Sequence, residues 1–233
     1  MQKKNKNILV TGTSSGIGKK IAQILLEKNY NVIGVSRKKV AFRNLRYKHL
    51  NYDISNREND NKILKILKKN KIKLDGIVNN AGTNLPNKFS LIKKNDYDIV
   101  MKTNLEGPFF LTQKLIQILK AKASIVNISS FSAISGGPVS THYAISKSGI
   151  EALTKNLAIT LQNKKIRVNA ISPGLIKTKM AKHPQKHPFY DRILAKRPGR
   201  PIDIANVTNF LLSENSDYIN GQIINVDGGM FFR

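Results

Sequence analysis

One stretch decides the fold of this chain of 233 residues: Asn7-Ile8-Leu9-Val10-Thr11-Gly12-Thr13-Ser14-Ser15-Gly16-Ile17-Gly18. Residues 7–11 are typical of a buried strand, and the amphipathic residues 17–28 predict a helix that begins among the glycines. Glycines in such a turn let the backbone approach a pyrophosphate, whose charge the helix N-terminus stabilises. The spacing G-x-x-x-G-x-G differs from the general G-x-G-x-x-G pattern, and a glycine-rich turn can be only a turn. Its place between a first strand and a first helix nevertheless favours a dinucleotide site.

Apolar runs alternate with amphipathic segments along the rest of the chain. The expected strands are residues 7–11, 31–36, 49–52, 76–80, 124–128, 166–171 and 222–226. The expected helices are residues 17–28, 63–69, 96–119 (as one or two helices) and 143–162. This alternation predicts an α/β fold, a Rossmann-type doubly wound parallel sheet of seven strands with helices on both faces. No internal repeat or long linker divides the chain, so we expect residues 1–233 to form a single NAD(P)-binding domain.

Composition excludes several classes of protein. A hydrophobic fraction of 40% is ordinary for a folded domain, and no apolar run is long enough to span a bilayer. The N-terminus has no signal-peptide core, so we expect a cytoplasmic location and no membrane contact. With no cysteine, the chain has no disulfide, thiolate metal site or cysteine nucleophile, although this does not fix the compartment.

The formal net charge of +26 has three interpretations. Nucleic-acid binding needs the basic residues clustered on one face, and the lysines are scattered, so nucleic acid is the least favoured partner. An acidic ligand or partner, steered by the net field, is the second interpretation. The third is compositional drift toward Lys, Asn and Ile, which the abundance of Asn and Ile favours.

The end of the second predicted strand bears on the choice of cofactor. A carboxylate there would bind the ribose hydroxyls of NAD, whereas an arginine accommodates the 2′-phosphate of NADP. The chain has Ser36-Arg37-Lys38-Lys39 and no acid at this point, so NADP(H) is favoured over NAD(H). The alternative is that Arg37 is one more surface base of a basic protein.

Tyr143 and Lys147 are four residues apart in a segment expected to be helical, so both would lie on one face. A nearby positive charge favours the phenolate and lowers the pKa of a tyrosine, which makes the pair a candidate proton donor near pH 7. Taken alone, such a pair is more often a solvated helix face.

In combination these residues resemble a family. The matching motifs, in chain order, are the turn at 11–18, Asn79-Asn80-Ala81-Gly82, Asn104 in 102–105, Asn127-Ile128-Ser129-Ser130, the pair Tyr143 and Lys147, Pro173-Gly174 with Thr178 beyond, and Val226-Asp227-Gly228-Gly229. From Ile8 to Gly229 the chain resembles the short-chain dehydrogenase/reductase family in its compact one-domain form. One departure is the short connection Lys38–Tyr47, where family members usually have a helix.

The resemblance implies hydride transfer between a nicotinamide cofactor and a carbonyl or alcohol. Tyr143 would protonate the carbonyl oxygen, Lys147 would lower the pKa of the tyrosine and bind the ribose, Ser130 would donate to the same oxygen, and Asn104 would hold a water that relays protons. The catalytic set is Asn104, Ser130, Tyr143 and Lys147. The cofactor-binding set is Gly12, Ser14, Ser15, Gly16, Ile17, Gly18, Ser36, Arg37, Asp53, Ile54, Asn80, Ala81, Gly82, Tyr143, Lys147, Pro173, Gly174, Ile176 and Thr178. No metal is expected.

Several of these assignments have alternatives. Ser129 is the active hydroxyl if the register slips by one residue. Asn79 and Asn80 can serve only to close backbone hydrogen bonds at a strand end. Asn104 can cap or bridge helices.

Residues 181–197 occupy the place of the family's substrate lid. Two prolines break any long helix there, and no carboxylate triad accompanies His183 and His187, so we expect a mobile, basic, substrate-facing loop rather than a metal site.

The predicted function is that of an NADPH-dependent carbonyl reductase. Residues 193–229 look most like the bacterial 3-oxoacyl-acyl-carrier-protein reductases, and Lys120, Lys122, Lys164 and Lys165 are expected near the mouth, where they would attract the acidic carrier. The alternatives are a reductase or dehydrogenase of a sugar, polyol or other small alcohol, and a non-catalytic binding protein on the same scaffold. The family also implies a homotetramer or homodimer, joined through the helix that carries Tyr143 and the helix before it.

Overall fold

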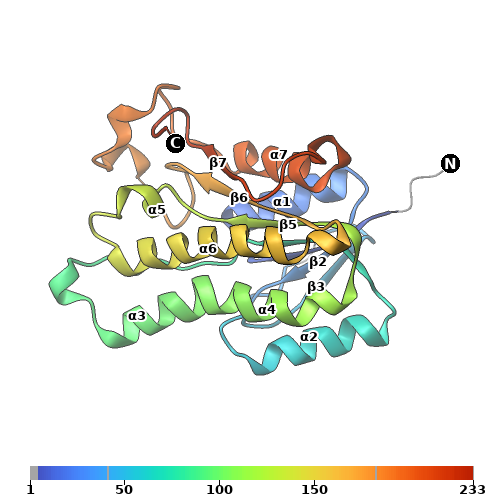
Figure 1. Cartoon of the computed structure of the whole chain (residues 1–233). Coiled ribbons are helices and arrows are strands. Elements are labelled where there is room, and N and C mark those ends of the chain that lie inside the picture. Colours follow the sequence, from blue (N-terminus) through green and yellow to red (C-terminus); the bar gives the residue numbers. More distant parts are fainter. Residues whose placement is uncertain (1–4, 41, 182, 233) are drawn as a thin grey trace.

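The computed structural model describes residues 5–40, 42–181 and 183–232 (Figure 1). Met1–Lys4, Ala41 of the predicted short connection and Lys182 of the predicted lid lie outside the described residues. Seven strands form one sheet in the order β3-β2-β1-β4-β5-β6-β7, and every neighbouring pair is parallel. The strands are β1 (Asn7–Thr11), β2 (Asn31–Val35), β3 (Tyr47–Leu50), β4 (Leu74–Asn79), β5 (Leu119–Ile128), β6 (Arg167–Pro173) and β7 (Ile223–Val226).

Helices cover both faces of this sheet, as Figure 1 shows. They are α1 (Gly16–Glu27), α2 (Glu58–Lys69), α3 (Lys94–Met101), α4 (Gly107–Leu115), α5 (Ser132–Ser135), α6 (Thr141–Thr160) and α7 (Pro201–Leu212). Apolar side chains of α1 and α7 pack into one core cluster, and those of α2, α4 and α6 pack into the other. The predicted Rossmann-type doubly wound fold is confirmed.

The pattern of β1 explains why both faces must be covered. Its successive side chains point to opposite faces, so Ile8 and Val10 join the core under α1 and α7, while Leu9 joins the core under α2, α4 and α6. All three side chains are fully buried. A strand with apolar residues on both faces is stable only between two helical layers. No helix in the described part of the chain is long and apolar enough to cross a membrane.

The predicted helix over residues 96–119 is wrong in its extent. A π-helical turn at Lys102–Glu106 separates α3 from α4, and a short 3-10 turn at Ile116–Ile118 leads into β5 at Leu119. Leu119 is part of the sheet because it pairs with Leu74 of β4, a contact distant in sequence. Apolar runs of this length do not distinguish a buried helix end from a strand.

The helix α7 is absent from the sequence-based prediction. Its start carries recognisable signals: Pro201 occupies the first helical position, and the carboxylate of Asp203 accepts a hydrogen bond of 2.8 Å from the backbone nitrogen of Arg200. The short connection between β2 and β3 agrees with its prediction, because none of its described residues is helical.

Candidate active site

The carboxyl ends of the strands open onto a cavity of about 790 Å³. This edge is where parallel α/β sheets place their ligand sites, because the strand-to-helix turns and the helix N-termini converge there. Every residue of the predicted catalytic and cofactor-binding sets lines this cavity, except Gly18 and Asn104. The structure therefore brings together residues from the turns that follow six different strands.

Gly18 does not line the cavity, and the turn leaves no room for a side chain at this position. A Cβ added at Gly18 would overlap the amide nitrogen of Asn80 and the carbonyl oxygen of Gly12. Gly12 and Gly16 have φ values of +75° and +55°, which glycine adopts without the steric cost that a Cβ brings. The turn is thus built from glycine for two reasons, close packing at position 18 and left-handed backbone at positions 12 and 16.

Asn80 fastens the end of β4 to the glycine turn. Its side-chain nitrogen donates to the carbonyl oxygen of Thr11 at 2.9 Å, and the Thr11 hydroxyl accepts from the backbone nitrogens of Asn80 and Ala81, both at 3.0 Å. These contacts agree with the structural alternative for Asn80, although the residue also lines the cavity.

Asn79 belongs to a buried hydrogen-bond chain that the sequence did not reveal. Its side-chain nitrogen donates to the Thr112 hydroxyl at 3.0 Å and to the side-chain oxygen of Asn127 at 2.8 Å. Asn127 in turn donates to the hydroxyl of Thr154 at 2.8 Å. The chain ties β4 and β5 to α4 and α6, and thereby supports the strands whose ends form the cavity.

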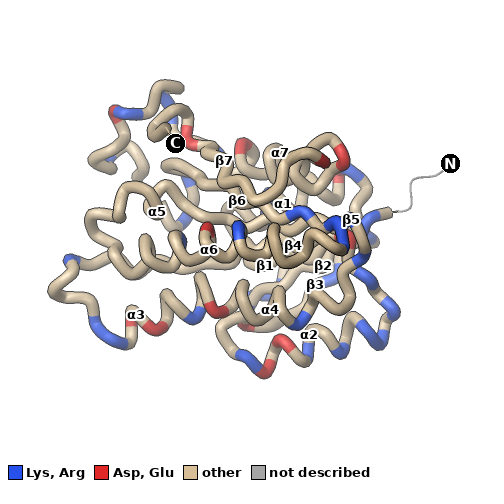
Figure 2. Tube along the Cα trace, viewed as in Figure 1, with Lys and Arg blue, Asp and Glu red and all other residues tan. Residues whose placement is uncertain are grey.

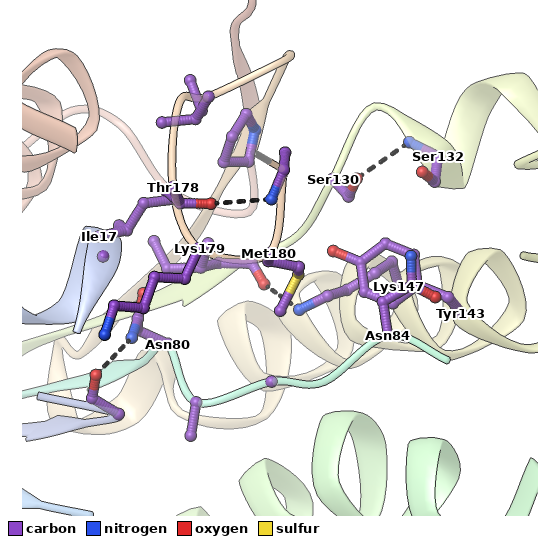
Figure 3. A pocket seen from close by; sticks show the side chains of 18 of the residues that line it. Ile17, Asn80, Asn84, Ser130, Ser132, Tyr143, Lys147, Thr178, Lys179 and Met180 are labelled. Carbon is purple, nitrogen blue, oxygen red and sulfur yellow. Dashed lines mark hydrogen bonds between the residues drawn. The ribbon is translucent and has the colours of Figure 1, made fainter. Parts of the chain in front are cut away.

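Tyr143 and Lys147 lie on the cavity face of α6, with the Lys147 nitrogen 5.7 Å from the centre of the Tyr143 ring (Figure 3). The Lys147 ammonium is buried and donates to the carbonyl oxygen of Ile128 at 2.8 Å. The hydroxyl of Ser130 accepts from the backbone nitrogen of Ser132 at 3.1 Å and acts to lower the pKa of the Tyr143 phenol. Three polar groups from the β5 end and α6 thus meet in one place.

Ser129 is buried beside these groups but is engaged elsewhere. Its hydroxyl lies 2.8 Å from a carboxylate oxygen of Glu151 and 3.4 Å from the carbonyl oxygen of Lys147. Its single hydrogen is therefore directed away from Tyr143. This arrangement favours Ser130 over Ser129 as the hydroxyl of the site.

The electrostatics of the pair differ from the prediction. Burial raises the pKa of Tyr143, and the Ser130 hydroxyl opposes this rise only in part. Burial also lowers the pKa of Lys147 to about 8. Desolvation disfavours the charged form of each group and outweighs the expected effect of the ammonium on the phenol. At pH 7 both groups are protonated, which is the state that a proton donor to a carbonyl requires.

Asn104 is fully buried at the π-helical turn between α3 and α4. Its side-chain oxygen accepts from the backbone nitrogen of Thr83 at 2.8 Å, and its nitrogen donates to the Thr83 carbonyl oxygen at 2.9 Å and to the Ser146 hydroxyl at 3.1 Å. Both amide hydrogens are used, so the side chain can offer a water only an acceptor position. The contacts support the bridging alternative, with Asn104 joining the loop after β4 to α6.

A carboxylate lies beside Arg37 at the rim of the cavity, although the sequence around Arg37 contains no acidic residue. The Arg37 guanidinium lies 3.9 Å from a carboxylate oxygen of Asp53, which comes from the turn after β3. The other Asp53 oxygen accepts from the backbone nitrogen and the hydroxyl of Ser55, at 2.9 and 2.8 Å. The Arg37 side chain is 76% exposed and remains free to turn toward a ligand.

The segment predicted as a lid packs on the C-terminal residues through an aromatic cluster, which comprises Phe131, His187, Phe189 and Phe231. The rings of Phe131 and Phe231 are stacked at 11° with centres 6.0 Å apart, and Phe189 meets both edge-on. The Asp227 carboxylate accepts from the backbone nitrogen of Phe231 at 2.9 Å, which fixes the tail beneath the segment. Since Phe131 follows Ser130, this cluster borders the site.

His183 and His187 both line the cavity, but they do not form a metal site with other ligands. Among the residues that the structure describes, no group of three or more His, Asp or Glu side chains could hold a metal ion. This agrees with the chemistry of the segment, which is basic and aromatic.

The prediction that Lys120, Lys122, Lys164 and Lys165 lie near the mouth is wrong. Lys120 and Lys122 are at the start of β5, and Lys164 and Lys165 directly precede β6, so all four lie at the amino edge of the sheet. Lys120 pairs there with Asp75 at 2.8 Å. Figure 2 shows basic residues spread over most of the molecule. Besides Lys147, the Lys and Arg residues that line the cavity in the described part of the chain are Arg37, Lys38, Lys179 and Lys186, and sequence reasoning missed the last two as individual site residues.

A parallel sheet of this order, with a glycine turn and a buried Ser-Tyr-Lys group at its carboxyl edge, defines a nucleotide-binding oxidoreductase of Rossmann type. Residues 12–231 match the family model described as "Enoyl-(Acyl carrier protein) reductase". The chain is 34% identical to a 3-oxoacyl-acyl-carrier-protein reductase of Thermotoga maritima, with 99% of each chain covered. The chain belongs to the short-chain dehydrogenase/reductase family and is close to its 3-oxoacyl-acyl-carrier-protein reductases.

Solved structures agree with this assignment. A short-chain dehydrogenase family protein from Francisella tularensis superposes with a TM-score of 0.91 at 30% identity, covering 97% of this chain and 99% of that chain. A 4-hydroxyisoleucine dehydrogenase complexed with NADH superposes with a TM-score of 0.88 at 29% identity, covering 97% of this chain and 98% of that chain.

Proposed function

We propose that this protein is an NADPH-dependent carbonyl reductase that acts on a 3-oxoacyl group attached to acyl carrier protein. The observation that supports this most strongly is the meeting of Ser130, Tyr143 and Lys147 in the cavity that also contains the glycine turn. The similarity to 3-oxoacyl-acyl-carrier-protein reductases supports the choice of substrate.

A nicotinamide cofactor would supply the hydride in this reaction. The glycine turn and the N-terminus of α1 would hold its pyrophosphate, and Thr178, which lies over Gly16, would contact the nicotinamide end. A Cβ added at Gly16 would stand 3.6 Å from the Thr178 methyl carbon, so the turn after β6 closes directly over the glycine turn.

The protein groups would handle the proton. Tyr143 would donate its phenolic proton to the carbonyl oxygen as that oxygen gains negative charge, and Ser130 would stabilise the same oxygen by a hydrogen bond. Lys147 is protonated at pH 7 and would support the tyrosinate that remains, because an ammonium near a phenolate lowers its energy. We retain in this proposal the predicted water held by Asn104, which would donate a hydrogen bond to the side-chain oxygen of Asn104 because both amide hydrogens are already used.

The direct test is oxidation of NADPH with acetoacetyl-acyl-carrier-protein, compared with acetoacetyl-pantetheine, a ketose and 4-hydroxyisoleucine with NADP⁺. We expect the carrier-bound substrate to give the highest kcat/KM, because Lys179 and Lys186 line the cavity and would attract an acidic carrier. Equal kcat/KM for the pantetheine and carrier forms would remove the carrier from the proposal. Turnover of the ketose or of 4-hydroxyisoleucine, without turnover of either acetoacetyl substrate, would favour a dehydrogenase of a small alcohol instead.

That second candidate is a dehydrogenase of a small alcohol, such as a sugar, polyol or hydroxy amino acid. It is supported by the structural similarity to 4-hydroxyisoleucine dehydrogenase, which is 29% identical and was solved with NADH. A non-catalytic binding protein is disfavoured, since the complete set of Ser130, Tyr143 and Lys147 is in place.

The preference for NADPH is tested at Arg37. Replacement of Arg37 by Ala should raise the Kd for NADPH by roughly 10- to 100-fold, because one or two charge-assisted hydrogen bonds to the 2′-phosphate are lost, and should leave the Kd for NADH nearly unchanged. Arg43→Ala is the matched control, since Arg43 is exposed in the same connection and does not line the cavity. An equal loss of affinity for both nucleotides, or no loss for either, would contradict the role of Arg37.

We further propose a homodimer or homotetramer that forms through α4 and α6. Phe109, Phe110, Ile145 and Ile159 of these helices are each at least 36% exposed, and exposed apolar side chains that gather on one surface are typical of protein–protein interfaces. Light scattering measures the assembly directly. The cytoplasmic location, the single domain over residues 1–233 and the mobile lid over residues 181–197 stay predictions.

A further inference from the structure

The connection between β2 and β3 is short, and two aromatic residues, one within it and one at its end, cover the adjacent face of the sheet. Phe42 and Tyr47 pack against the same core cluster as α1 and α7, with their rings 4.6 Å apart and nearly perpendicular. Tyr47 stands at the start of β3, yet its hydroxyl reaches the carboxyl edge of the neighbouring strands. It does so because its ring lies along the sheet over Gly34.

Gly34 makes this arrangement possible. A Cβ added there would overlap the Tyr47 hydroxyl and would stand 2.7 Å from the Thr13 hydroxyl oxygen. The absence of a side chain in the middle of β2 therefore opens the space in which Tyr47 and Thr13 meet.

The Tyr47 hydroxyl joins two residues at once. It lies 3.1 Å from the hydroxyl of Thr13 and 2.9 Å from Nδ1 of His49. A phenol has one hydrogen and two acceptor positions, so it can take part in both bonds. Burial lowers the pKa of His49, which keeps the ring neutral at pH 7 and able to accept from Tyr47.

Thr13 lies inside the glycine turn, between Gly12 and Ser14, which both line the cavity. Its own side chain is fully buried and is not among the residues that line the cavity. Anything that holds the Thr13 hydroxyl therefore acts on a ligand only through the backbone of the turn. Asn51, just after β3, holds the backbone that follows β2. With its amide nitrogen turned inward, its side chain donates hydrogen bonds to the carbonyl oxygens of Ser36 and Arg37, at 3.0 and 2.6 Å.

We propose that Tyr47 is a positioning residue for the nucleotide site, which holds the glycine turn in its binding conformation through the hydrogen bond to Thr13. This inference rests on the proposed binding of NADPH. The bond fixes the backbone on either side of Thr13, where the turn must present its N–H groups to a pyrophosphate. Part of the cost of ordering the turn is thus met before the nucleotide binds.

The test is the Kd for NADPH of the full-length Tyr47→Phe protein, measured by fluorescence titration beside its Tm. Loss of one neutral hydrogen bond should raise the Kd about fivefold and leave kcat at saturating NADPH unchanged. Thr13→Val should raise the Kd to a similar extent. The double variant should have the same Kd for NADPH as either single variant, because each substitution removes the same hydrogen bond. Thr13→Val keeps the volume of the side chain and serves as the second variant if Tyr47→Phe folds poorly.

Tyr30→Phe is the matched control. Tyr30 packs on the same core cluster and is buried to a similar degree, but it precedes β2 at the amino edge of the sheet. An unchanged Kd for Tyr47→Phe, an equal loss for Tyr30→Phe, or additive losses in the double variant would each overturn the inference. If the wild-type protein binds neither NADPH nor NADH, the proposed function fails and this inference fails with it. If the wild type binds and the variant binds equally well, this inference alone fails.

Discussion

A Tyr143→Phe enzyme should still bind NADPH, but it should reduce its carbonyl substrate about a thousandfold more slowly. The phenylalanine ring keeps the packing of α6 against the cavity and removes only the proton donor, and positioned general acids contribute roughly 10²- to 10⁴-fold to rates. The pKa of Tyr143 is raised by burial, so the wild-type phenol carries its proton over the whole neutral range. Steady-state kinetics at saturating NADPH, together with a nucleotide titration, measure the two effects separately.

Ser130→Ala provides the comparison for this result. Ser130 would only stabilise the oxygen that Tyr143 protonates, so its loss should slow turnover less than the loss of the phenol itself, by about a hundredfold. A Tyr143→Phe enzyme that retains more than about a tenth of wild-type kcat would show that another group donates the proton. The proposed chemistry of the site would then be incorrect.

The second large effect is expected from Gly18→Ala. An added methyl group overlaps the backbone carbonyl oxygen of Gly12, which cannot move away at low cost, and the side-chain nitrogen of Asn80, which is held by its hydrogen bond to the carbonyl oxygen of Thr11. We expect the free energy of unfolding to fall by about 2 kcal/mol, as for other overpacked sites, and the affinity for NADPH to fall by more than about tenfold. Chemical denaturation and nucleotide titration of the same preparation test both parts.

Gly149→Ala is the control for the helical context. Gly149 lies within α6, and the nearest atoms to a Cβ there belong to the branched end of the Leu105 side chain, which can rotate. In each variant the intrinsic helix propensity of alanine favours the folded state by about 1 kcal/mol relative to glycine. A difference in unfolding free energy between the two variants therefore reports the difference in crowding. Equal stability and equal NADPH affinity in the two variants would mean that the turn adapts to a side chain at position 18.

The sequence predicted the features that depend on local patterns. The strand, glycine turn and helix over residues 7–28 follow from apolar runs and glycine positions, and the pair Tyr143 and Lys147 follows from helical spacing. Nearly all the residues that the family motifs predicted for the site line one cavity, because each motif follows the end of a strand and the strands are parallel.

The features that the sequence did not predict depend on contacts between distant segments. The Asp53 carboxylate reaches Arg37 from the turn of another strand, and the buried chain through Asn79, Asn127 and Thr154 exists only once β4 and β5 lie side by side. The direction of the Tyr143 pKa depends on burial, which a helical spacing does not reveal. Lys120 was placed at the wrong edge because proximity to a motif in sequence says little about which end of a strand a residue occupies.

The stacking of Phe231 on Phe131 has a practical consequence for anyone who handles this protein. Phe231 is close to the end of the chain, and Asp227 and Asn225 both bond its backbone, at 2.9 and 3.1 Å. An affinity tag or fluorescent fusion at the C-terminus would be attached beside a ring that packs next to Ser130. Residues 5 and 6, by contrast, lead into the amino end of β1, on the far side of the sheet from the cavity. Fusions and surface attachment are therefore best made at the N-terminus.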